Sequence, residues 1–167
     1  MDPQAIFDNF RDTVTNHYFD MNGRVGRAQF WYFALANFVF AILATIVQHA
    51  VWLPVAALYN LAMLLPCAGM GARRLQDTGR DGRLVWVLIV VAAVTQVFAL
   101  FTLMAGPLGV LGFLAFWFTI GWLINLVLLI AAIALIYFWC QPGDPGPNAY
   151  GPVPPVFDPA KRVSPAP

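Results

Sequence analysis

Long apolar runs separated by short polar segments dominate the hydrophobic pattern of the chain. No Asp, Glu, Lys or Arg occurs between residues 28 and 72 or between residues 84 and 142. A helix crosses the hydrocarbon core of a bilayer with about 20 apolar residues. Each charge-free stretch is long enough for two crossings. The pattern therefore predicts a membrane domain over residues 28–140, with four spans at about residues 30–48, 51–71, 84–105 and 121–139.

The first two spans are predicted to form a tight hairpin. Gln48 and His49 interrupt the apolar stretch and mark its turn. Pro66 lies well inside the second helix, where we expect it to cause a kink. Arg73 and Asp77 are four residues apart, which indicates that this helix extends beyond the apolar run with the two side chains on one face.

The stretch between the third and fourth spans allows two interpretations. Residues 105–109 contain Gly and Pro and are typical of a break. Residues 107–119 then form either an interfacial or re-entrant piece or the first part of one long tilted helix. We favour a break near Gly121, which leaves the fourth span to follow it.

The two ends of the chain differ from the apolar middle. Residues 1–27 form a polar arm in which Asp2 and Pro3 favour a helix start. Apolar residues at helical spacing in this arm indicate an amphipathic helix on the membrane surface, and a loosely ordered arm is the alternative. Residues 141–167 are rich in Pro and Gly, so we expect an extended tail, anchored near residues 148–151.

Composition and charge exclude several classes of protein. The chain has 167 residues, of which 60% are hydrophobic and 10% are charged. A soluble domain carries about 25% charged residues, so this composition is typical of an integral membrane protein. The formal net charge of +1 provides no basic surface for nucleic acid. Neither His17 nor His49 has neighbours at metal-ligand spacing, and we expect no metal or cofactor.

The distribution of bases predicts the topology. Lys and Arg occur before the first predicted span, between the second and third, and after the fourth. The turns near His49 and Gly106 contain none. Cytoplasmic loops carry an excess of Lys and Arg. We therefore expect both termini in the cytoplasm.

Three motifs resemble those of one family. Phe19–Arg24, Arg27 and Phe30–Phe33 resemble a Gly-Arg, Arg, aromatic-Trp pattern. Residues 73–82, Arg-Arg-Leu-Gln-Asp-Thr-Gly-Arg-Asp-Gly, resemble an Arg-Arg-Leu-His-Asp-Thr-Gly-Arg-Ser-Gly motif. Residues 140–152 resemble a signature of Cys, Pro-Gly, Gly-Pro-Asn and Tyr-Gly-Pro. Together the motifs resemble the domain-of-unknown-function 805 family of small bacterial inner-membrane proteins.

The resemblance covers residues 19–154 and implies a location in the bacterial inner membrane. It implies no activity. Gln76 stands where the family usually has His, so we expect no chemistry that depends on that imidazole here.

Arg and Asp residues around the first two spans are expected to meet at the cytoplasmic edge of the membrane, because the hairpin brings the second helix end beside the first helix start. Arginine binds phosphate and carboxylate bidentately. We therefore predict contact with anionic lipid headgroups or a partner by Arg24, Arg27, Arg73, Arg74, Asp77, Arg80 and Asp81. The alternative is that these arginines only set the topology.

Amide side chains inside the predicted spans need hydrogen-bond partners. We predict inter-helix polar contacts at Asn37, Asn60, Gln96 and Asn125. The alternative role for such side chains is to line a passive conduit for a small solute or a lipid.

The sequence contains no catalytic signature of the common hydrolase or phosphate-binding types. We therefore predict a non-catalytic accessory or interaction subunit, which contacts the bilayer and forms a membrane-protein complex or a homo-oligomer. An enzyme acting on lipid headgroups through Asp77 or Asp81 is the least favoured alternative.

Overall fold

The computed structural model describes residues 2–158, except the side chains of Ala92, Gln96, Ala99, Leu103, Phe113 and Ile120. Within this range the elements are α1 (Pro3–Asn16), α2 (Arg27–Val51), α3 (Val55–Asp77), η1 (Gly82–Val85), α4 (Trp86–Phe116), η2 (Trp117–Gly121) and α5 (Trp122–Cys140). Four described segments are long and apolar enough to cross a membrane: Arg27–Val51, Val55–Asp77, Gly82–Thr102 and Trp122–Cys140. The predicted all-α, four-span class is confirmed.

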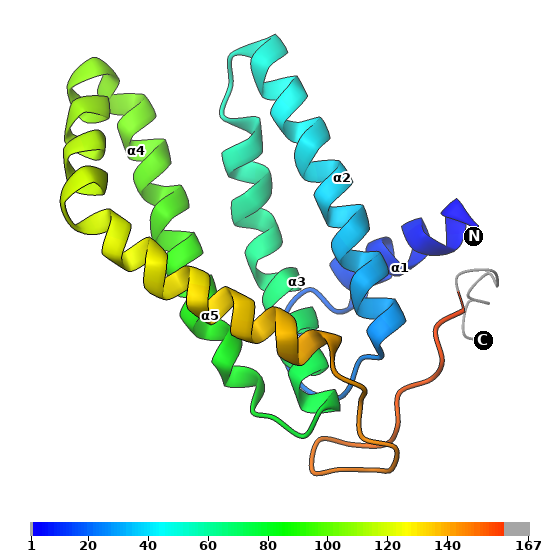
Figure 1. Cartoon of the computed structure of the whole chain (residues 1–167). Coiled ribbons are helices and arrows are strands. Elements are labelled where there is room, and N and C mark those ends of the chain that lie inside the picture. The colour runs from blue at the N-terminus through cyan, green and yellow to red at the C-terminus, as the bar shows by residue number, and fades with distance from the viewer. Residues whose placement is uncertain (1, 159–167) are drawn as a thin grey trace.

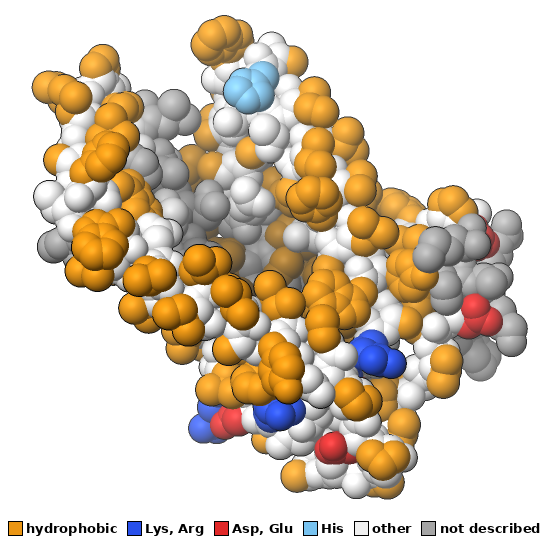
Figure 2. Space-filling view, in the orientation of Figure 1, with side chains coloured by type: hydrophobic (Ala, Val, Ile, Leu, Met, Phe, Trp, Pro, Cys, Tyr) orange, Lys and Arg blue, Asp and Glu red, His pale blue; other side chains and the backbone are white. Residues whose placement is uncertain are grey.

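The helices form two hairpins that meet at one end of the molecule (Figure 1). We call this end the charged end, formed by residues 17–27, the last turn of α3, residues 78–85 and the end of α5. Helices α2 and α3 run antiparallel, and α4 starts beside the end of α3. The hairpins diverge away from the charged end. In Figure 2 the Arg side chains in view lie toward the lower, charged end with some of the Asp side chains, and other Asp side chains lie at the right of the view.

Two interruptions shape the second hairpin. At Gly106 the backbone is non-helical, with φ of 66° and ψ of −151°, and Pro107 follows. The chain reverses there, and the rest of α4 runs back along its first part (Figure 1). The second interruption is the π-helical turn η2, where Asn125 donates to the Gly121 carbonyl at 2.8 Å. Helix α5 then returns at an angle to the charged end.

The N-terminal arm is helical and packs on α2. Asp2 caps α1 through a 2.9 Å bond from the Gln4 N–H, as the sequence predicts. The fully buried residues of α1 are Ala5, Asn9 and Thr13. Phe10 of the apolar stripe also packs against the core, whereas Phe7 is half exposed. Small and polar side chains allow α1 to approach closely, and Asn9 donates to the Gln29 carbonyl at 3.1 Å.

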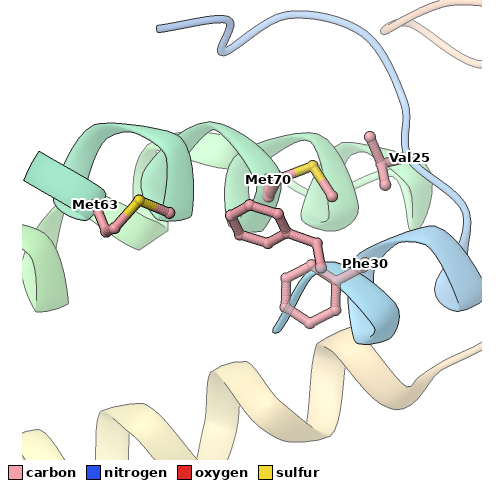
Figure 3. Close-up of a cluster of buried hydrophobic side chains, with 5 residues drawn as sticks. Val25, Phe30, Met63 and Met70 are labelled. Atoms are coloured by element: carbon pink, nitrogen blue, oxygen red, sulfur yellow. The ribbon is translucent and has the colours of Figure 1, made fainter. Parts of the chain in front are cut away.

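The core lies at the charged end, on two sides of α3. One cluster joins the segment before α2 to α2 and α3. It consists of Val25, Phe30, Phe33, Met63 and Met70. Figure 3 shows Met70 close to the phenylalanine rings and Met63 further along α3. The second cluster joins α3 to η1 and α5 and consists of Ala68, Ala72, Leu75, Val85 and Leu135. Packing within the chain is therefore concentrated where the charged residues gather.

Pro66 leaves one backbone carbonyl of α3 without its helical hydrogen bond. Proline has no N–H, so the carbonyl of Ala62 loses its helical partner. The Tyr18 hydroxyl donates to that carbonyl at 2.6 Å. The segment after α1 is thus held against α3 by the hydrogen bond that the proline leaves open.

We expect Tyr18→Phe to lower the free energy of unfolding by about 1 kcal/mol, because the Ala62 carbonyl then lacks a partner. The measurement is thermal or chemical unfolding in detergent micelles. In a Pro66→Ala background the backbone N–H is restored, and the Tyr18→Phe cost should shrink toward zero. Equal costs in the two backgrounds would contradict the assignment.

Candidate functional site

Asp77, the last residue of α3, is the centre of a buried ion-pair network. Its Oδ1 accepts from Arg24 Nε at 3.0 Å and lies 2.9 Å from Arg24 Nη2. Its Oδ2 accepts from Arg74 Nη1. The exposed fractions of the Arg24, Arg74 and Asp77 side chains are 1%, 0% and 4%. Burial strengthens these ion pairs, and it makes the loss of one partner costly.

Arg24 connects this network to the segment after α5. Its Nη1 donates to the Gly146 carbonyl at 2.7 Å, and its Nη2 donates to the Asp144 carbonyl at 2.7 Å. The guanidinium fork therefore uses its donors on one carboxylate and on backbone carbonyls. Arg24 holds the chain before α2 against the chain after α5.

Arg74 caps the C-terminal end of α5. Its Nε donates to the Trp139 carbonyl at 3.0 Å, and its Nη2 donates to the Gln141 carbonyl. The last carbonyls of a helix lack helical partners and attract cations. Two arginines and one aspartate leave one net positive charge in the network, and these carbonyl dipoles stabilise it.

Residues 141–151 form a loop docked on the end of α3. The Asp144 N–H donates to the Asp77 carbonyl at 2.8 Å, and Asn148 Nδ2 donates to the Gln76 carbonyl at 2.9 Å. A β-bridge joins Asn148 to Gly151. These contacts satisfy carbonyls at the end of α3, so the loop acts as its cap.

The other predicted cluster residues lie around the network. Helix α3 extends to Asp77 as predicted, but the Arg73 guanidinium lies 3.7 Å from the Asp20 carboxylate and forms no ion pair with Asp77 among the described residues. The Arg80 guanidinium lies 4.3 Å from the centre of the Phe138 ring. Arg27 and Asp81 are exposed. The structure thus brings Arg24, Arg74 and Asp77 together, whereas it leaves Arg27 and Asp81 open to solvent or lipid.

The amide side chains predicted to make contacts between spans differ in their hydrogen bonds. The Tyr59 hydroxyl donates to Asn37 Oδ1 at 2.8 Å, which joins α2 to α3. Asn125 bonds to its own helix at η2. Asn60 has no side-chain hydrogen bond within residues 2–158, and the Gln96 side chain lies outside what the structure describes. Across the described residues, no three His, Cys, Asp or Glu side chains converge on a metal position.

Sequence reasoning predicted an anchor near residues 148–151, where Asn148 bonds to the end of α3, but it missed Gly143, Asp144 and Gly146 as parts of the docked loop. The density of Pro and Gly in residues 141–167 indicated one extended tail. The Gly-Pro-Asn and Tyr-Gly-Pro signature was the available signal, because these residues build the docked loop.

Fold and site define a polytopic α-helical membrane protein whose charged end is closed by a buried Arg-Asp network. Comparison with protein families then shows that the chain belongs to the family described as "Protein of unknown function (DUF805)", whose model matches residues 18–152. The resemblance inferred from the motifs is confirmed.

Curated relatives come from Escherichia coli. The inner membrane protein YhaI of strain K12 is 29% identical over 142 residues, which cover 83% of this chain and 89% of the relative. The inner membrane protein YhaH of the same strain is 26% identical over 148 residues, covering 84% and 92%. No solved structure gives a significant match. Neither the family description nor the names of these relatives assigns a catalytic activity.

Proposed function

We propose that the protein is a non-catalytic interaction subunit of a bacterial inner membrane, with its charged end and both termini in the cytoplasm. The relatives are named as inner membrane proteins, which supports the inner-membrane location. The placement of Lys and Arg supports the cytoplasmic position of the charged end and of both termini. The helices α4 and α5 associate with a second copy of the chain or with another membrane protein.

This proposal is supported mainly by the unequal burial of the four spans within the chain. Within the chain, 22% and 39% of the apolar windows of α2 and α3 are buried. The corresponding shares are 7% for Gly82–Thr102 and 6% for α5. Helix association in membranes depends on close packing. Two helices that are almost unburied within the chain therefore expose apolar surface for packing against another helix.

The exposed surface of α4 and α5 contains an open groove between the two helices. It encloses about 430 Å³ and is lined by residues that include Leu88, Thr95, Asn125, Leu128 and Ala132. Thr95 donates to its own helix at Val91, and Asn125 donates to Gly121. These local partners support a packing surface rather than a shared path for a solute.

The exposed bases at the charged end add contact with lipid. Arg27 starts α2 and Arg83 lies in η1, and both side chains are exposed. A base at this level gains about 1 kcal/mol from anionic headgroups. Because Arg24 and Arg74 are buried, the proposed lipid contact is restricted to the exposed members of the cluster.

The test is purification in native nanodiscs followed by mass determination of the intact assembly. We expect a stoichiometric complex, and we expect Ala132→Phe to lower its yield about ten-fold by filling the groove. Ala134→Phe makes the same change on α5 outside the groove and should leave the yield unchanged. A monomeric wild type, or equal yields for the two variants, would exclude this association.

A further inference from the structure

A second polar feature lies at the charged end, beside the ion-pair network. It is a pocket of about 440 Å³ with a mostly polar lining. Its lining includes Asn22, Gln76, Asp81, Arg83, Trp86 and Tyr150. These residues come from the segment before α2, the end of α3, the start of α4 and the docked loop. The volume lies within the range of about 300–1,000 Å³ that small-molecule sites occupy.

Gln76 offers this pocket an unused hydrogen-bond acceptor. The residue is 7% exposed, and its Nε2 donates to the Met21 carbonyl at 2.9 Å. Its Oε1 has no hydrogen-bond partner among the described residues. A buried acceptor without a partner is unfavourable, and native structures contain few of them. A ligand that carries an N–H group supplies the missing donor.

The two charged side chains of the lining have opposite signs. One carboxylate oxygen of Asp81 accepts from the Arg83 N–H at 2.9 Å and caps η1. Within the described residues neither side chain belongs to an ion pair, and both are exposed. A ligand with a single charge would meet one group of like charge. A zwitterion would find a partner for each of its charges.

The position of the pocket relative to the spans further restricts the class of ligand. Gln76 is the next-to-last residue of α3, and Trp86 is the first residue of α4. The pocket therefore lies at the level where the apolar spans end, which is the level of lipid headgroups. Trp is enriched at this boundary because one edge of its ring is polar.

We propose that this pocket binds the headgroup of a zwitterionic aminophospholipid, with the ammonium group at Asp81 and Gln76 Oε1 and the phosphate at Arg83. The assignment rests on the proposed function only in placing the charged end at headgroup level. It is independent of any association through α4 and α5.

The test compares lipids that differ in the ammonium group alone. The protein is purified in detergent, stripped of lipid and mixed with phosphatidylethanolamine or phosphatidylcholine of identical acyl chains. Retained lipid is then counted by native mass spectrometry. The quaternary ammonium of phosphatidylcholine has no N–H to donate. We expect phosphatidylethanolamine to be retained about ten-fold better.

Two variants assign this preference to the pocket. Asp81→Asn should reduce the ratio of retained phosphatidylethanolamine to phosphatidylcholine at least about three-fold. Arg83→Gln should lower the retention of both lipids at least about three-fold, because both carry the phosphate. Asparagine keeps the oxygen that caps η1, so the fold is retained, which circular dichroism checks. Arg11→Gln removes the same charge from the exposed side of α1, outside the pocket, and should leave both the ratio and the retention unchanged.

Equal retention of the two lipids would overturn the proposal, as would an unchanged ratio in the Asp81→Asn protein or unchanged retention in the Arg83→Gln protein. A further arm uses soluble glycerophosphoethanolamine, which has the headgroup without acyl chains. Binding of this probe as tight as that of the lipid would assign the pocket to a soluble zwitterion and overturn the lipid assignment. Loss of the nanodisc complex in the Ala132→Phe experiment affects none of these readouts.

Discussion

Replacement of Asp77 by asparagine is expected to lower the free energy of unfolding by about 3–5 kcal/mol. The two side chains are almost equal in size, so packing is retained while the negative charge is lost. Arg24 and Arg74 then remain buried, with exposed fractions of 1% and 0%, without a counter-charge. The measurement is chemical unfolding in detergent micelles, followed by tryptophan fluorescence.

The matched control for this variant is Asp81→Asn. Asp81 is exposed and belongs to no ion pair within the described residues, and asparagine retains its cap on η1. We expect a change of less than about 0.5 kcal/mol in this case. Similar unfolding transitions for the two variants would show that the Asp77 carboxylate does not hold the charged end together.

Alanine at position 143 is expected to displace the docked loop. A Cβ at Gly143 would lie 2.1 Å from Asp77 Oδ2 and 2.6 Å from its Cγ. The carboxylate is held by two arginines and has no room to turn away. The loop must move instead, which costs about 1–3 kcal/mol from overpacking and about 1 kcal/mol for each hydrogen bond lost at Asp144.

Gly146→Ala is the control for this prediction, because a Cβ at Gly146 has no atom within 4 Å. Its carbonyl still accepts from Arg24 in the variant, since only the side chain changes. Limited proteolysis of residues 141–158 reads out the docking, together with unfolding in micelles. We expect rapid cleavage in the Gly143→Ala protein alone. Equal protection of the two variants would argue against the close contact with Asp77.

The spans were predictable because their signal is local. An apolar run long enough to cross a bilayer predicts a helix wherever its partners lie. Helix ends with a local chemical cause were predictable too. Asp2 caps α1 through its own side chain, as its place before Pro3 predicts.

The partners of Asp77 were not predictable in the same way. Spacing along a helix shows which side chains share a face, and it favoured Arg73. In the structure Asp77 pairs with Arg74 one position further along and with Arg24 from another segment. The packing of α3 against its neighbours decides which arginine turns inward, and that packing is a property of the whole chain.

The docked loop shows a second limit. The two arginines hold it through backbone carbonyls: Arg24 donates to Asp144 and Gly146, and Arg74 donates to Gln141 and to Trp139 at the end of α5. Every residue has a carbonyl, so residue type does not indicate which of them accepts a bond from arginine. A high density of Pro and Gly excludes a helix, and it is compatible with a defined irregular loop.

The long sequence separation within the network determines when it forms during synthesis. Arg24 bonds to carbonyls 120 and 122 residues later, and Arg74 bonds to carbonyls 65 and 67 residues later. Translation places the early spans in the bilayer while these acceptors do not yet exist. Until residues 139–146 have been synthesised, Arg24 and Arg74 lack their carbonyl acceptors, although their common partner Asp77 is already present. In a chain arrested within α5 the guanidinium groups of Arg24 and Arg74 therefore lack these acceptors, and the network closes only after the loop that follows α5 has been synthesised.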